Sequence, residues 1–250
     1  MDLIFNAEAA AENGHAEEAL HLVEATAQQE WMLLAVLFIP LIGFLLTGLV
    51  GRRLGERPWI ISISAVLISA GLATILAFSA LFAEDPVRYG FTLYEWIPLG
   101  QVEIAGETIE PSVEFGFLFD NLTAVMLIVV TWIGSLVHIY SIGYMEHDDS
   151  KWRFFSYLNL FMFSMLLLVM ADSYLVVFAA WELVGLSSYL LIGFWYTKRA
   201  PALASKKAFL VNRVADHGFL IGIMGVFLIT GTMNMLDSFD LFQAEWWVED

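Results

Sequence analysis

Ionisable side chains inside long apolar segments are the residues of this sequence whose chemistry most needs an explanation. Glu182 is the clearest case, because it lies about nine residues from either end of the apolar run 174–196. A charge at the centre of a membrane span costs at least about 2.5–3.5 kcal/mol on insertion scales, so a carboxyl group there needs a partner or a function. Because small residues permit close helix packing, we expect Glu182 inside a helix bundle, as a proton relay or as a static hydrogen-bonded acid. Its small neighbours in sequence are Ala179, Ala180, Gly185, Ser187 and Ser188.

A second set of ionisable residues lies on the next apolar run, 207–230. Arg213 and Asp216 are three residues apart and would share one face of a helix. Lys207 begins the run, and Arg213 lies about two helical turns deeper. A basic series of this kind indicates part of an ion path or a lock between helices, and the alternative is a self-neutralised structural pair. His217 adjoins the pair and is interpreted as a hydrogen-bonded packing residue.

Two more ionisable residues lie toward opposite ends of the run 115–140. Asp120 is near its start, where the helix dipole favours an acid. His138 is near the other end. It is a candidate for proton uptake because an imidazole titrates near neutral pH. The alternative is an interfacial histidine without that role.

These side chains require a membrane-spanning scaffold. The 250 residues are 59% hydrophobic, with a mean hydropathy of +0.72. Apolar runs of about 18 residues or more suffice to cross about 30 Å of hydrocarbon as helices, whereas a barrel needs short alternating strands. We therefore predict an all-α membrane protein of about six transmembrane helices. They are expected at 31–50, 59–82, 115–140, 154–171, 174–196 and 207–230.

The segments outside these helices are polar. Between the second and third helices, residues alternate in Phe91–Trp96 and Val102–Ile104, with a turn candidate at Gly106. This alternation predicts a small β-hairpin in the loop. The expected organisation has three parts: an acidic leader at 1–30, the helical bundle at 31–231 and an acidic tail at 232–250.

The distribution of charge predicts an orientation. The net charge is −16, from 27 acidic and 11 basic residues, and with six spans nine of the basic residues fall on one side. Arg88 falls on the other side and Arg213 within a span. By the positive-inside rule both ends of the chain lie outside the cytoplasm, and most of the acidic excess is a solvated outer face. The absence of a basic stripe argues against nucleic-acid binding. The nine are Arg52, Arg53, Arg57, Lys151, Arg153, Lys198, Arg199, Lys206 and Lys207.

The residue inventory also limits the cofactors. The sequence has no cysteine, which excludes thiolate-held iron–sulfur and zinc sites from these residues. No phosphate loop, dinucleotide fingerprint, catalytic triad or metal-ligand cluster is recognisable. We therefore expect neither a cofactor nor a metal in this chain.

Four stretches carry a resemblance to a known family. Tyr140–Met145 and Arg153–Phe161 resemble the antiporter-like subunits of respiratory complex I. Trp181–Trp195 and Lys206–Asp216 match more specifically, and resemble subunit L of bacterial NADH–quinone oxidoreductase and its mitochondrial counterpart, chain 5. The resemblance covers about residues 31–231. It implies the N-terminal portion of a longer subunit, since family members continue through further helices, one with a lysine that pairs with the fifth-helix glutamate.

The resemblance implies a role for each ionisable residue. Glu182 falls on the family's proton-translocating glutamate; Arg213, Asp216 and Lys207 fall on positions of ionic coupling between neighbouring antiporter-like subunits. The departures are Leu183 and Ala215, where many relatives have glycine, and neither removes a titratable group.

The function implied is a proton-translocating subunit of NADH–quinone oxidoreductase in the bacterial inner membrane, surrounded by lipid and by other complex I membrane subunits. NADH, FMN, iron–sulfur clusters and quinone would lie in the rest of the complex, and the chain would have no redox site of its own. One alternative is the large subunit of a multi-subunit sodium/proton antiporter, against which Val184-Gly185 argues. The other alternative is a non-conducting membrane scaffold.

Overall fold

Six helices in the described part of the chain are long and apolar enough to cross a membrane, which confirms the predicted class of multi-pass membrane protein. The computed structural model describes residues 23–24, 26–55, 57–83, 87–98, 102–104, 107–109 and 112–239. The predicted surface helix of the leader, the Gly106 turn and most of the predicted tail lie outside these residues. The helices are α2 (Ala27–Val50), α3 (Trp59–Leu81), α4 (Asn121–Tyr144), α5 (Lys151–Met170), α6 (Tyr174–Ile192) and α7 (Arg199–Thr230).

Local capping sets where two of these helices begin. α2 begins four residues before Trp31, because the side chains of Thr26 and Gln29 cap its first turn reciprocally. α7 begins at Arg199 and is eight residues longer at its start than the predicted run. Pro201 lies in its first turn, where a missing backbone N–H leaves no hydrogen bond unmade.

The predicted start of the third helix at residue 115 is wrong. Residues Ser112–Phe119 form strand β5, and α4 begins only at Asn121. The short run of apolar residues before Asp120 fits either a buried strand or a helix, and pairing with a second strand makes it a strand. Asp120 is the N-cap of α4, and its carboxylate accepts a hydrogen bond from the amide of Thr123 at 2.7 Å. The interpretation of Asp120 as a helix-start acid is therefore confirmed.

The outer loop holds two small sheets. Strand β2 (Tyr89–Pro98) pairs antiparallel with β5, and β1 (Val23–Glu24) adds to its other edge in parallel. Strand β3 (Val102–Ile104) pairs antiparallel with β4 (Glu107–Ile109). The predicted hairpin is thus confirmed, but Phe91–Trp96 belongs to β2 and pairs with β5, not with Val102–Ile104.

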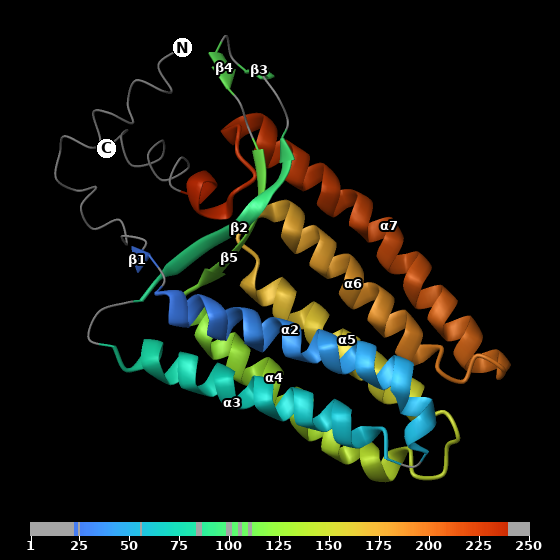
Figure 1. Cartoon of the computed structure of the whole chain (residues 1–250). Coiled ribbons are helices and arrows are strands. Elements are labelled where there is room, and N and C mark those ends of the chain that lie inside the picture. The colour runs from blue at the N-terminus through green and yellow to red at the C-terminus, as the bar shows by residue number, and fades with distance from the viewer. Residues whose placement is uncertain are drawn as a thin grey trace.

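The order of packing leaves α7 at one edge of the bundle (Figure 1). α2 packs against α3 and α5, α3 against α4, α5 against α6, and α6 against α7. The main core lies among α2 to α6 and includes Phe117 and Phe119 of β5. Within α7 the buried residues are Ser205, Asp216 and Ile223. The remaining face of α7 is largely apolar and exposed, as expected of a helix that faces lipid or another membrane segment.

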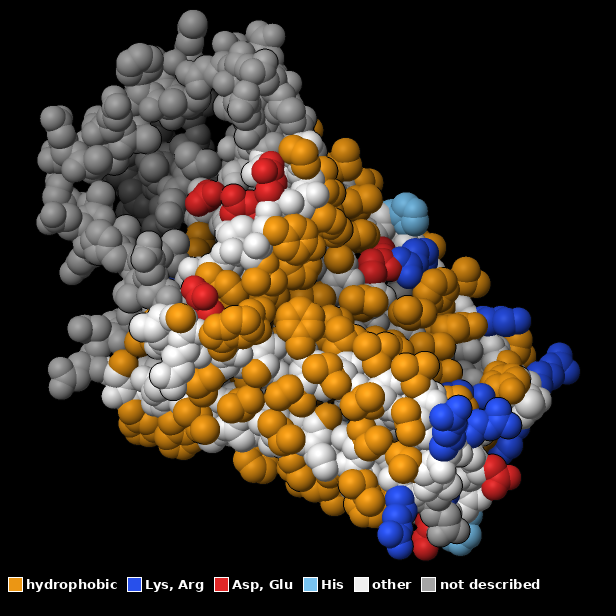
Figure 2. All heavy atoms as spheres, viewed as in Figure 1, with side chains coloured by type: hydrophobic (Ala, Val, Ile, Leu, Met, Phe, Trp, Pro, Cys, Tyr) orange, Lys and Arg blue, Asp and Glu red, His pale blue; other side chains and the backbone are white. Residues whose placement is uncertain are grey.

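The two ends of the bundle carry opposite charge. The nine basic residues predicted for one side lie in η2 (Gly51–Leu54) or at the adjoining starts of α3, α5 and α7. Figure 2 shows Lys and Arg side chains gathered at this end and acidic ones near the sheet. We call it the basic end; the sheet lies at the opposite end, between α3 and α4 in sequence. The distribution fits the orientation predicted by the positive-inside rule, which stays a prediction.

Asp172, in the connection between α5 and α6, joins three segments at the sheet end. Its carboxylate accepts a hydrogen bond from the amide of Gly116 on β5, and its carbonyl accepts one from the N–H of Met235 at 3.0 Å, beyond α7. Burial is the main cause that raises the pKa of Asp172 from 3.8 to about 6, and the negative charges of Glu114 and Asp237 act in the same direction. One titratable group thus lies where the sheet, the α5–α6 hairpin and the segment after α7 meet.

The stability of this junction should depend on pH. Because the folded chain binds the Asp172 proton more tightly than the unfolded chain, the free energy of unfolding should fall as pH rises from about 4 to about 6, by up to about 3 kcal/mol, and level off above. Asp172→Asn should remove this slope in unfolding measured in detergent at fixed pH values. Asp120→Asn is the matched control, since either residue caps a helix, and it should keep the slope. An equal slope in the Asp172→Asn variant would contradict the assignment.

Candidate charge site between α6 and α7

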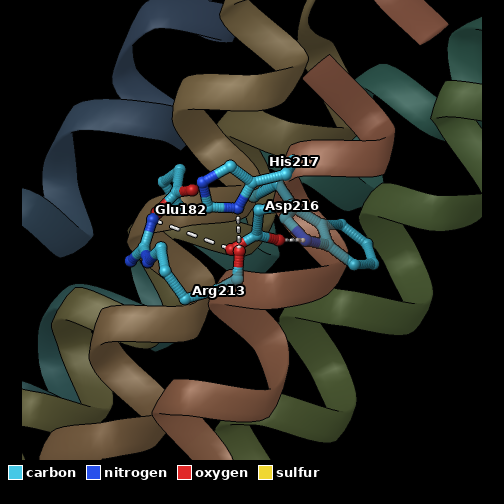
Figure 3. Close-up of polar contacts among 5 residues, drawn as sticks. Glu182, Arg213, Asp216 and His217 are labelled. Atoms are coloured by element: carbon cyan, nitrogen blue, oxygen red, sulfur yellow. Dashed lines mark hydrogen bonds and ion pairs between the residues drawn. The ribbon is translucent and has the colours of Figure 1, made fainter. Parts of the chain in front are cut away.

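Glu182 and Arg213 lie at the same level of an antiparallel helix pair. Glu182 is 16 residues before Lys198, and Arg213 is 16 residues after Thr197, so both are equally far from the turn that joins α6 to α7. The Arg213 guanidinium forms an ion pair with the Glu182 carboxylate (Figure 3). Both side chains are partly exposed in the described chain, at 37% for Arg213 and 21% for Glu182. Each is about mid-way along a helix predicted to span the membrane.

Arg213 also faces a second carboxylate on its own helix. Its Nη1 lies 3.7 Å from Oδ2 of Asp216, so the predicted i,i+3 pair is present. The Asp216 side chain is only 8% exposed, far less than Arg213. One cation is therefore shared by two carboxylates, one on α6 and one on α7.

An indole fixes Asp216 from the α6 side. Nε1 of Trp181 donates a hydrogen bond to Oδ1 of Asp216 at 3.0 Å, which leaves Oδ2 toward Arg213. The Trp181 ring also meets the edge of Phe219 on α7, with ring centroids 6.1 Å apart. Consecutive residues of α6, Trp181 and Glu182, thus hold opposite ends of the charged set on α7.

Aromatic rings line the same helix pair toward the basic end. The guanidinium of Arg213 lies 4.7 Å from the ring centroid of Phe209, one turn earlier on α7, a cation–π contact. Phe209 in turn packs against Tyr189 of α6 at 5.3 Å between centroids. These rings limit where the guanidinium can move.

The small residues near Glu182 face away from this site, toward α5. Ala180 and Ser187 are fully buried, and the Ser187 hydroxyl lies 3.4 Å from that of Ser164 on α5. α6 therefore packs closely on α5 with one face, as its small residues predict, and presents Glu182 to α7 with another. Glu182 lies at the α6–α7 contact and not in the main core.

The other candidates of the sequence lie apart from the ion pair. Lys207 is exposed near the start of α7, about two turns from Arg213. His217 is exposed, and its Nδ1 lies 2.7 Å from the carbonyl oxygen of Arg213. His138 is only 2% exposed, on α4, which packs chiefly against α3 and α5. Its Nδ1 lies 2.7 Å from the carbonyl oxygen of Gly134, and its Nε2 has no hydrogen-bond partner among the described residues. The interfacial interpretation of His138 does not fit this burial.

Three contacts of the site were missed in the sequence: the Glu182–Arg213 ion pair, the Trp181–Asp216 hydrogen bond and the Phe209–Arg213 contact. The signal for the first was available. In an antiparallel hairpin, residues equally far from the turn lie side by side, and the positions of Glu182 and Arg213 meet that condition. In the described structure, Arg213 thus fills the position of cationic partner that was expected from a later helix.

The geometry and the scaffold define the class as a multi-pass membrane protein with a charge cluster between two of its spans. Residues 108–155 match the family described as NADH-Ubiquinone oxidoreductase (complex I), chain 5 N-terminus. Residues 171–248 match the family described as NADH:quinone oxidoreductase/Mrp antiporter, TM. The chain belongs to the antiporter-like membrane subunits that these two descriptions cover.

Curated relatives agree with this family. The chain is 41% identical over 199 residues to NADH-ubiquinone oxidoreductase chain 5 of Dictyostelium discoideum, over 79% of this chain and 28% of the relative. It is 39% identical over 211 residues to NADH-quinone oxidoreductase subunit L of Mycobacterium tuberculosis, over 84% of this chain and 31% of the relative. The chain thus spans about a third of the length of such relatives.

A solved structure shares the fold. The structure of the membrane-bound sulfane sulfur reductase, an archaeal respiratory membrane complex, matches with a TM-score of 0.66 over 81% of this chain and 38% of the matched chain. The sequence identity is 15%, so the likeness concerns the fold alone.

The hydrogen bond between Trp181 and Asp216 should contribute measurably to stability. Trp181→Phe keeps an aromatic ring but removes the donor to a charged acceptor, which should lower the free energy of unfolding by about 1.5–3 kcal/mol. The matched control is Trp132→Phe, which removes a 2.9 Å bond to the neutral hydroxyl of Thr74 and should cost about 0.5–1.5 kcal/mol. The measurement is unfolding of the complete protein in detergent. A Trp181→Phe variant as stable as the unmodified protein would show that Asp216 does not depend on the indole.

Proposed function

We propose that this chain forms the N-terminal part of a proton-translocating, antiporter-like subunit of an NADH–quinone oxidoreductase. The observation that carries the proposal is the single cation, Arg213, shared by Glu182 and Asp216. Family membership supports it, as does the identity to subunit L and chain 5. The membrane depth of the cluster is the physical reason for it, since a charge at that depth needs a partner or a function.

The cluster has the charge count that a proton carrier needs. With both carboxylates ionised it holds two negative charges and one positive charge, so one negative charge is left over. A proton that binds Glu182 balances the set, and Arg213 is then free to pair with Asp216. When Arg213 returns to Glu182, the proton leaves. Proton binding and movement of the guanidinium are thereby coupled through simple electrostatics.

The surroundings suit this exchange. Trp181 holds Asp216 so that one of its oxygens faces Arg213, and Phe209 provides a ring for the guanidinium. Lys207 lies toward the basic end, where its charge can act on Arg213 and through it on Glu182. In this proposal a charge change in a neighbouring antiporter-like subunit moves Arg213, and the neighbour thereby sets when Glu182 binds its proton. His138 would serve a separate route through α4, since α4 packs chiefly against α3 and α5.

The proposal divides the work of the enzyme. NADH, FMN, iron–sulfur clusters and quinone belong to other parts of the complex, and this chain contributes proton translocation to the translocase. The basic end faces the cytoplasm, and the sheet and both chain ends face outward, in a bacterial inner membrane. The complex I membrane subunits beside it are its partners.

A sodium/proton antiporter is the second candidate function. The family description that matches residues 171–248 names Mrp antiporters as well as NADH:quinone oxidoreductase. The two functions differ in one measurable respect: an antiporter exchanges sodium for protons without NADH. Sodium-driven proton movement in vesicles without NADH would favour the antiporter.

The proposal is tested by Glu182→Gln in the complete complex in its native membrane. Glutamine keeps the size and polarity of the side chain but cannot carry the proton. Proton pumping per NADH oxidised should fall at least about tenfold, a small effect for loss of a proton-transfer group. Pumping is followed with a pH-sensitive dye alongside NADH oxidation.

The matched control is Glu146→Gln, a carboxylate in the exposed turn at the basic end, which should leave pumping unchanged. Assembly of the complex is measured in parallel. Normal assembly with normal pumping in Glu182→Gln would overturn the proton role. A defect of assembly in which pumping and oxidation fall together would favour the scaffold alternative.

A further inference from the structure

A cavity at the basic end has a lining that needs an anion. It lies between α5, α6 and the start of α7, and its volume is about 320 Å³. Two cations line it, Arg153 from α5 and Lys206 from α7, and no acidic side chain does. Among the described residues, neither cation has an ion pair.

Arg153 is held in place but is not satisfied. Its Nη2 donates to the carbonyl oxygen of Phe194 at 3.0 Å, and its guanidinium lies 4.7 Å from the ring centroid of Phe194 and 5.0 Å from that of Tyr196. Its Nε is buried without a hydrogen-bond partner in the described structure. A guanidinium that is positioned by two rings and a carbonyl, yet keeps an unused donor beside a cavity, is suited to bind a phosphate oxygen.

The rest of the lining distinguishes a lipid from a free anion. Tyr157, Tyr189 and Tyr196 border the cavity together with Ser205, so rings and hydroxyl-bearing side chains surround the cations. Aromatic side chains of this type favour the boundary between headgroups and acyl chains. Next to the cavity, Leu203 and Leu210 of α7 are 56% and 64% exposed, which provides an apolar surface for acyl chains.

We propose that this cavity binds the phosphate headgroup of an anionic phospholipid, with Arg153 and Lys206 as its cationic contacts and the outer face of α7 against its acyl chains. Basic pockets between membrane helices on the cytoplasmic side bind anionic headgroups for the same reason. The proposal does not depend on the proton role of Glu182, because it concerns other residues at the end of the bundle.

The absence of cysteine from these 250 residues permits a direct test of occupancy. Ala202→Cys places a thiol in the wall of the cavity, and Thr197→Cys places one on the neighbouring exposed turn outside it. The complete protein is reconstituted in nanodiscs of phosphatidylcholine, without or with phosphatidylglycerol. Alkylation of each cysteine by a neutral thiol reagent is then followed by mass spectrometry of the labelled peptide.

Phosphatidylglycerol should slow alkylation at Ala202→Cys at least about fivefold, the effect of one well-placed charge, and should leave Thr197→Cys unchanged. Adding Lys206→Gln should reduce this protection about fivefold, and Arg153→Gln should do at least as much. Arg53→Gln, an exposed cation at the same end outside the cavity, is the matched control and should keep the protection. If Arg153→Gln fails to fold, the exposed Lys206 carries the test.

A third sample adds inorganic phosphate to phosphatidylcholine nanodiscs and should give no protection. Equal protection by phosphate alone would overturn the lipid assignment in favour of a free anion. Equal alkylation of Ala202→Cys with and without phosphatidylglycerol would overturn the site itself.

Discussion

Arg213 lies between two carboxylates in a pair of helices that are long and apolar enough to cross a membrane, and this arrangement constrains everything around it. Neither Glu182 nor Asp216 can be placed at that depth without a cation, and one guanidinium serves both. The contact fixes the register of α7 on α6, because a shift of one turn would separate the charges. Trp181 and Phe209 then limit the positions open to Asp216 and Arg213.

The rest of the fold places this pair of helices at the edge of a firmly packed bundle. Helices α2 to α5 share the main apolar core, whereas α7 buries few residues and packs against α6 alone among its close neighbours. Small side chains attach α6 to α5, and charged and aromatic side chains attach α7 to α6. A contact built from exchangeable charges can rearrange more easily than an apolar core, which suits a site proposed to bind and release protons.

The sequence predicted the scaffold better than the site. Apolar length alone located six helices, since lipid leaves the backbone few alternatives, and the nine basic residues do lie at one end. The start of α4 was misplaced because Ser112–Phe119 is apolar enough for a helix, and only its pairing with β2 makes it a strand. The residues Glu182, Arg213 and Asp216 were identified from charge in apolar runs. Their mutual contacts depend on the rotation of α6 and α7 about their axes, which spacing within one helix does not give.

The most direct measurement of the central claim is a double-mutant cycle on the ion pair, with Glu182→Gln, Arg213→Met and the double variant unfolded in the same detergent. Each single variant leaves a charge without its partner, so each should be less stable than the unmodified protein, whereas the double variant should be more stable than the sum of the two losses. Because both side chains are partly exposed, the expected coupling is modest, at least about 1 kcal/mol. Additive losses would contradict the account, because they would show that Glu182 and Arg213 do not act on one another.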